Sequence, residues 1–168
     1  MPNERRDAIK AEAEYRAAIA LEPDFIPAYA NLADLYQNYK REDEAESVLN
    51  AGLERAPDNA DLTHALGLLR IRQGRTADAL PMLARSAQLD STNPRYAYVY
   101  GVALHDTGQA KKAMTVLEQA LARFPRSPEI LSALVPYTRE AGDTRRADEY
   151  AKRLNALVPQ ADASSPAQ

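Results

Sequence analysis

The chain contains no cysteine, so histidine and the carboxylates are its side chains best suited to binding a metal ion. The two histidines, His64 and His105, fall in two neighbouring expected helices. Their positions within their own helices differ by about seven residues. This corresponds to roughly 10 Å along a helix, which rises about 1.5 Å per residue. The ligands of one zinc ion each lie about 2 Å from the metal. The pair is therefore spaced too widely for a shared metal site, and we interpret both histidines as single polar side chains.

The carboxylates do not predict an active site either. Nearly all of them lie in charged runs such as 41–44, which are typical of solvated turns. The sequence also has no Gly-rich phosphate loop, no nucleophile elbow and no His-x-x-x-His pair. We therefore predict a protein that is not an enzyme and that carries no cofactor.

The charge pattern disfavours nucleic acid and membranes as partners. The net charge is −3, and acidic and basic residues alternate along the chain, so no basic stripe could follow a phosphate backbone. No apolar run is long enough for a membrane span or a secretory signal. We expect a soluble protein whose compartment stays open: cytoplasmic by default, or periplasmic if the chain is a fragment of an exported protein.

The elements that position these side chains repeat with a period of 34 residues, and three residue types mark the period independently. Lys40 and Ser91 occupy the slots in which glycine and proline are missing. The recurring residues are Pro23, Pro57, Pro125 and Pro159; Ala11, Ala45, Ala79, Ala113 and Ala147; and Gly74, Gly108 and Gly142.

Each period reads as a helix, a turn and a second helix. The glycine ends the first helix in a left-handed conformation, and the alanine lets the two helices approach closely. Thr76 and Asp143 are expected to cap second helices, while Asp24, Asp58 and Ser127 are expected to cap first helices. Pro94 and Pro128 suit the first position of a helix.

This pattern resembles the tetratricopeptide repeat family. The first unit shows it as Leu32-Ala33-x-x-Tyr36, then Ala45-x-x-x-Leu49, then Pro57, and the resemblance extends over about 4–159. It implies an all-α fold, a right-handed superhelical solenoid of helix-turn-helix hairpins with about nine helices. Such a scaffold serves many pathways, so the resemblance specifies the fold far more closely than the function.

The repeat register divides the chain into three parts. Residues 1–22 match the second helix of a preceding repeat, residues 23–159 hold four hairpins (about 26–57, 60–91, 94–125 and 128–159), and residues 160–168 are expected to form a disordered tail. The unpaired first helix suggests that the chain was cut from a longer protein. Self-association through helix 4–21 is an alternative.

The resemblance also implies a binding groove, because first helices line the inner wall of such solenoids. A groove that is apolar in its middle favours a bound protein or peptide. The residues that distinguish a carboxylate clamp in this family are absent, since Ala30, His64, Tyr98 and Ser132 stand at the fifth position of the repeats. The expected groove residues are Asn31, Asp34, Asn38, His64, Leu68, Ile71, Arg72, Arg95, Tyr98, Val102, His105 and Arg139.

We therefore predict a scaffold for protein–protein interaction that binds a peptide or a partner helix in its concave groove. The alternative is a structural or assembly domain of a larger protein whose chemistry lies upstream. Residues 95–108 and the hairpin that follows are similar to repeat segments attached to multihaem c-type cytochromes. A cytochrome is therefore one form that the larger protein could take.

Overall fold

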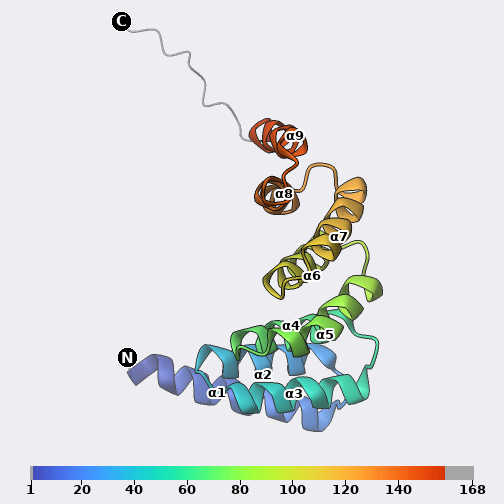
Figure 1. Cartoon of the computed structure of the whole chain (residues 1–168). Coiled ribbons are helices and arrows are strands. Elements are labelled where there is room, and N and C mark those ends of the chain that lie inside the picture. The colour runs from blue at the N-terminus through green and yellow to red at the C-terminus, as the bar shows by residue number, and fades with distance from the viewer. Residues whose placement is uncertain (1, 158–168) are drawn as a thin grey trace, which may run out of the picture. The chain divides into compact units, whose positions relative to one another are not determined.

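The computed structural model describes residues 2–157, except for the side chains of residues 2–4 (Figure 1). Over these residues the chain forms nine α-helices and no β-strand, which confirms the predicted all-α fold class. The expected disordered tail, 160–168, lies outside the described residues.

The chain divides into two compact units, Met1–Ser91 and Thr92–Gln168. The helices of unit 1 are α1 (Pro2–Leu21), α2 (Ile26–Asn38), α3 (Glu42–Arg55), α4 (Ala60–Arg72) and α5 (Thr76–Leu89). The described helices of unit 2 are α6 (Pro94–Asp106), α7 (Ala110–Arg123), α8 (Pro128–Glu140) and α9 (Thr144–Asn155).

Antiparallel hairpins are the building blocks of both units, and they pair α2 with α3, α4 with α5, α6 with α7, and α8 with α9. Gly74, Gly108 and Gly142 end the first helices of the last three hairpins with φ values of 74°, 79° and 83°, as their spacing predicts. Lys40 adopts the same left-handed conformation, with φ of 58°. A residue with a Cβ atom is strained in this conformation, so the first hairpin turns at a less favourable residue than the others.

The recurring alanines lie in the cores where paired helices meet. Ala45, Ala79, Ala113 and Ala147 are each 0% exposed, because only a small side chain leaves room for the facing helix. Among the glycines the tightest position is Gly101, where an added Cβ atom would lie 2.6 Å from two atoms of the Leu117 side chain.

Three of the predicted N-caps, Asp24, Asp58 and Thr76, are wrong by one residue. Asn59 caps α4, one residue after the expected Asp58, and Phe25 precedes α2 without a side-chain cap, one residue after the expected Asp24. Thr76 is the first residue of α5 rather than its cap. The two aspartates instead form ion pairs with arginines of later helices.

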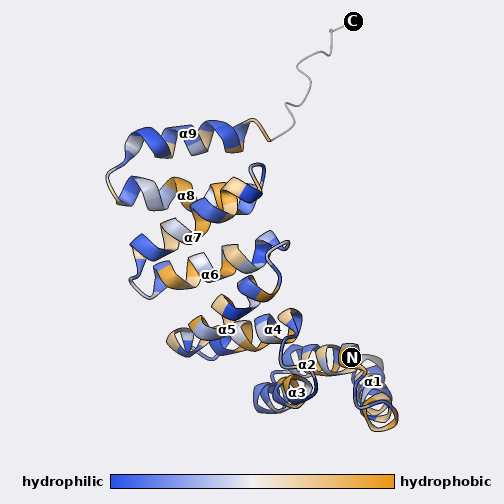
Figure 2. Ribbon diagram, turned by 90° about the vertical axis from the view of Figure 1, so that its right-hand side faces the viewer, coloured by the Kyte–Doolittle hydropathy of each residue, from blue (hydrophilic) through white to orange (hydrophobic). Residues whose placement is uncertain are grey.

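The other caps were predicted correctly. The Ser127 hydroxyl accepts a hydrogen bond from the backbone N–H of Ile130, and the Asp143 carboxylate accepts one from that of Arg146. Pro94 and Pro128 are the first residues of α6 and α8. Helix α9 is mainly hydrophilic, as its blue colour in Figure 2 shows, and its buried residues are Ala147 and Tyr150.

Candidate functional site

The predicted groove residues of unit 1 lie on α2 and α4. Asn31, Asp34 and Asn38 are exposed on α2, and on α4 Arg72 is exposed while Leu68 and Ile71 are half-buried. These side chains are therefore accessible to a partner to different degrees.

His64 is the exception, and its predicted place on an open wall is wrong, because the residue is only 6% exposed. Helix α4 contacts α2, α3 and α5 within its own unit. On the face that carries His64 the helix is covered, and the imidazole ring lies inside the structure.

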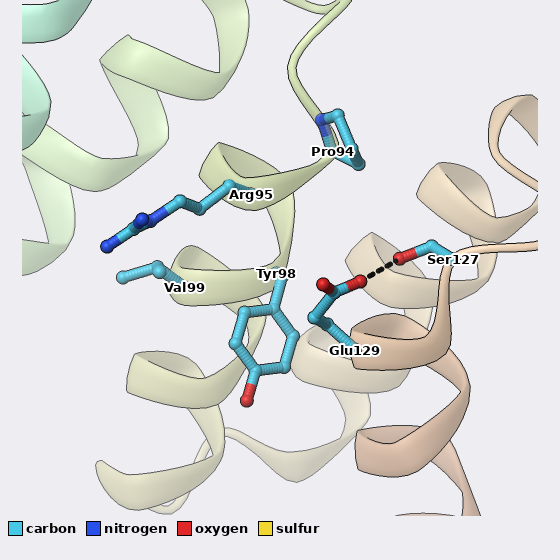
Figure 3. A pocket seen from close by; sticks show the side chains of 6 residues that line it. All are labelled: Pro94, Arg95, Tyr98, Val99, Ser127 and Glu129. Carbon is cyan, nitrogen blue, oxygen red and sulfur yellow. Dashed lines mark hydrogen bonds between the residues drawn. The ribbon is translucent and has the colours of Figure 1, made fainter.

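The first helices of unit 2, α6 and α8, contact each other and surround a hollow of about 280 Å³. Figure 3 shows the Tyr98 ring between Val99 of the same helix and Glu129 at the start of α8. The Ser127 hydroxyl donates a hydrogen bond of 3.0 Å to the Glu129 carboxylate. The hollow is lined by Pro94, Arg95, Tyr98, Val99, Ser127 and Glu129. Its lining combines an aromatic ring and aliphatic groups with one cation and one anion, which suits a peptide segment better than a single small ion.

A second group of side chains bridges α6 and α8. The His105 ring stacks on the Tyr137 ring with centroids 3.6 Å apart and planes inclined by 2°. The Nε2 atom of His105 lies 2.9 Å from Oε2 of Glu140. Burial raises the pKa of Tyr137 to about 12, and the negative charges of Asp106 and Glu140 add to this effect. The phenol therefore stays protonated at neutral pH, and His105 connects the two helices at one side of the wall.

Val102 lies between Tyr98 and His105 on the same face of α6, since residues three and four apart in a helix are neighbours. Val102 is half-buried, and Arg139 is exposed on α8. The α6–α8 wall, which we define as Arg95, Tyr98, Val99, Val102, His105, Glu129 and Tyr137, therefore offers aromatic and aliphatic surface between charged ends.

Three residues of this wall, Val99, Glu129 and Tyr137, are not in the set of expected groove residues given above. Glu129 stands one period after Arg95, so the repeat register alone could have identified it. Tyr137 could not have been found in this way, because its role comes from the stacking contact with His105 on another helix.

A charged cluster joins α1 to the first hairpin in unit 1. The Glu12 carboxylate of α1 accepts hydrogen bonds from Arg41 at 2.6 Å, from Arg16 at 3.1 Å and from the Tyr36 hydroxyl at 3.0 Å. The hydrogen bond from Arg41 is the largest cause of the low pKa of Glu12, about 2, with those from Tyr36 and Arg16 adding to it. Arg41 also binds Glu44 of α3. We interpret this cluster as structural, because each of its charges is matched by an opposite one.

Helix α1 buries one face and exposes the other. Tyr15 and Ile19 pack against the core of unit 1, whereas Ile9 and Leu21 are 66% and 83% exposed. Self-association through helix 4–21 stays a prediction, and these two exposed side chains are where it would be tested.

The described part of the chain offers neither a membrane span nor a metal site. None of its helices is long and apolar enough to cross a membrane. No group of three or more histidine, aspartate or glutamate side chains gathers there in a way that could hold a metal ion.

Comparisons with known proteins agree on the fold. The model of the family described as Tetratricopeptide repeat matches residues 4–69 and 70–135. The structure of MamA superposes with a TM-score of 0.79 at 17% identity, covering 92% of this chain and 91% of that one. YrrB, described as a TPR protein with an unusual peptide-binding site, superposes with a TM-score of 0.74 at 19% identity, covering 95% and 82% of the two chains.

Curated relatives are much longer than this chain. It is 32% identical over 162 residues to cellulose synthase operon protein C of Xanthomonas axonopodis pv. citri (strain 306), which covers 88% of this chain and 11% of the relative. It is 33% identical over 112 residues to the Vi polysaccharide export protein VexE of Salmonella typhi, covering 64% and 17%. None of these comparisons bears on the resemblance to cytochrome-attached repeats, which stays a prediction.

Proposed function

We propose, from the premise that this chain belongs to the tetratricopeptide repeat family, that it is a non-enzymatic scaffold which binds an extended peptide or a partner helix on the α6–α8 wall of unit 2. The family match covers more than half of the chain. Solenoid repeats present extended surfaces for binding other proteins, which supports the general class of function. The choice of surface is our proposal.

The observation that carries the proposal is the hollow beside Tyr98 and Val99. Both side chains are only half-buried, although aromatic and aliphatic groups are normally placed in the core. Partly exposed apolar surface inside a hollow marks interaction sites. A segment that buries these groups would gain about 25 cal/mol per Å² of apolar surface removed from water.

Unit 1 offers a second, separate wall, formed by Asn31, Asp34, Asn38, Leu68, Ile71 and Arg72. It is more polar than the α6–α8 wall, because four of its six members carry an amide or a charge, whereas four of the seven members of the α6–α8 wall are tyrosines or valines. We propose that it is a surface of its own, suited to polar contacts with a partner. A groove of this kind typically binds one peptide with a dissociation constant in the micromolar range, which corresponds to a binding free energy of about −8 kcal/mol.

A displayed library of random peptides tests the proposal, because selection from such a library needs no candidate partner. Peptides selected on the natural protein would be measured by fluorescence anisotropy against Val99→Asp, which places a carboxylate in the hollow. The matched control is Thr115→Asp. It adds the same charge at an exposed position of α7, and the threonine that it replaces has a shape similar to that of valine. We expect binding to be lost only with Val99→Asp. Equal binding by all three proteins, or the absence of any selected peptide, would show that the α6–α8 wall is not a binding site.

A Leu68→Asp variant tests the unit 1 wall in the same assay. If the selected peptides bind the α6–α8 wall, the variant should bind them as the natural protein does. Complete loss of binding would assign the main contact to unit 1 instead.

A second candidate function is an assembly role within the synthesis or export of a polysaccharide. Two relatives carry names from such systems, and this chain corresponds to a small share of each. Deletion of the gene in the source organism should then reduce exported polysaccharide, and a gene carrying Val99→Asp should fail to restore it. Unchanged polysaccharide after deletion would exclude this role.

A further inference from the structure

Arginine–aspartate bridges link the loops of unit 1 to later helices. Arg55 at the end of α3 binds the Asp24 carboxylate, with Nη2 2.7 Å from Oδ1. Arg85 of α5 binds the Asp58 carboxylate in the same manner. Asp24 and Asp58 stand one period apart, in equivalent loops that precede a first helix. Both loops are thus held by a pair of opposite charges.

The equivalent positions of unit 2 do not hold this carboxylate. The same period places Thr92 and Arg126 in the aspartate slot, so the last loop carries a positive charge where the first two carry a negative one. The arginine slots are retained, because Arg123 and Arg153 stand two periods after Arg55 and Arg85. Arg153 donates a hydrogen bond of 2.9 Å to the carbonyl oxygen of Pro125, as Arg85 does at 3.5 Å to that of Pro57, but it has no carboxylate partner among the described residues.

Three arginines therefore surround the loop between α7 and α8, and none forms an ion pair with another described residue. Arg123 and Arg126 line a second hollow, of about 440 Å³, together with apolar groups of Phe124, Pro125 and Pro128. The lining contains one carboxylate, that of Glu129, whose Oε2 accepts a hydrogen bond from the Ser127 hydroxyl.

The two hollows of unit 2 adjoin each other, since Pro94, Ser127 and Glu129 line both of them. A chain that passes from one to the other would first meet the apolar surface beside Tyr98 and then the arginines of the loop. Like charges held close together repel each other unless a partner neutralises them, and arginine pairs well with carboxylates.

We infer that the partner is an acidic protein segment: an apolar side chain enters the hollow beside Tyr98, and aspartate or glutamate residues next to it bind Arg123 and Arg126. This inference rests on the proposed function and names the chemistry of its ligand. The bound carboxylates would stand in for the aspartate that the last loop lacks. A nucleic acid fits less well, because the chain has net charge −3 and the cluster is confined to one loop.

The Arg126→Asp variant tests the inference, because it restores the residue found at the equivalent positions of unit 1. It should hold or raise the midpoint of urea unfolding, since Arg153 would gain the carboxylate partner that Arg85 has. It should also weaken the binding of peptides selected on the natural protein by about fivefold or more at low ionic strength. The matched control is Arg145→Asp, an exposed arginine at the start of α9 that lies about two helical turns from Arg153.

The composition of the selected peptides provides the second measurement. Peptides from the natural protein should contain more aspartate and glutamate than the input library, and peptides selected on Arg126→Asp should lose this excess. Selected peptides without an acidic excess, or equal binding by Arg126→Asp and Arg145→Asp, would overturn the inference. If such peptides still required Val99, the proposed function would stand. If the natural protein selected no peptide, both would fall.

Discussion

Replacing Glu12 with glutamine should destabilise unit 1 in a way that depends on pH. The substitution keeps the shape of the side chain and its ability to accept a hydrogen bond from Tyr36, but it removes the negative charge that Arg41 and Arg16 bind. It therefore tests whether the charge of Glu12 holds α1 against the first hairpin.

The size of the effect follows from the pKa of Glu12, which falls from 4.5 to about 2 in the folded protein. At about 1.36 kcal/mol per pKa unit, the shift corresponds to about 3 kcal/mol as an upper bound. The Arg41 side chain is 36% exposed, so water screens part of the interaction. We therefore expect a loss of about 1–2 kcal/mol in the free energy of unfolding.

The sign of the pH dependence follows from the direction of the shift. Because folding lowers the pKa, the ionised Glu12 contributes its full stabilisation above pH 4.5, and this contribution is lost as the pH falls through about 2. The stability difference between the natural protein and Glu12→Gln should therefore be largest near neutral pH and shrink in acid.

Urea unfolding followed by far-ultraviolet circular dichroism, at about pH 7 and about pH 2.5, measures this difference. Glu14→Gln is the control, because Glu14 lies on the same helix but makes only a weak ion pair. Its side chain is 66% exposed, and its Oε1 atom lies 3.9 Å from Nζ of Lys10. Its effect should stay below about 0.5 kcal/mol. Equal effects of the two substitutions at neutral pH, or a Glu12→Gln effect of the same size at both pH values, would refute the reasoning.

Three further substitutions test local packing and backbone geometry by thermal unfolding. Gly101→Ala should cost about 1–2 kcal/mol despite the better helix propensity of alanine, because its Cβ atom would lie 2.6 Å from the fully buried Leu117; an unchanged melting temperature would contradict this. Lys40→Gly should stabilise the protein by about 0.5–1 kcal/mol, since glycine adopts the observed φ of 58° without strain, and a loss of stability would show that the strain is absent. Phe25→Asn should add about 0.5–1 kcal/mol by supplying the cap that Asn59 provides to α4; destabilisation would mean that the half-exposed Phe25 ring makes contacts worth more than a cap.

The repeat period predicted the hairpins well because the physical demand recurs at every repeat. Ala45, Ala79 and Ala113 are fully buried, since each lies where two helices must approach closely. The glycine slots were equally predictable, including the one that Lys40 occupies, because a left-handed residue is needed at each of these turns.

The caps show where sequence patterns lose precision. Asp58 and Asn59 are both good acceptors and adjacent in the chain, so the sequence does not show which of them caps α4. In the structure the Asn59 side chain accepts a hydrogen bond of 2.9 Å from the backbone N–H of Leu62, and Asp58 forms an ion pair with Arg85. The choice depends on an arginine 27 residues away, which no local pattern contains.

The candidate site was predictable only as a set of positions. The register places Tyr98 and Val102 on the first helix of a repeat, yet it does not show that Tyr137 stacks on His105 or that His64 is buried. These properties depend on which side chains of neighbouring helices meet, and this is decided by packing in three dimensions.

The arrangement of contacts has a consequence for how the chain acquires its structure. Within each unit, extensive contacts join helices that follow one another in the chain or that are separated by a single helix. Short separations of this kind keep the entropy lost on closing each loop small, and proteins dominated by them typically fold within microseconds to milliseconds. The contacts of a hairpin such as α2–α3 can therefore begin to form as soon as its residues have left the ribosome, and the hairpins that follow complete the core that a single repeat cannot bury alone.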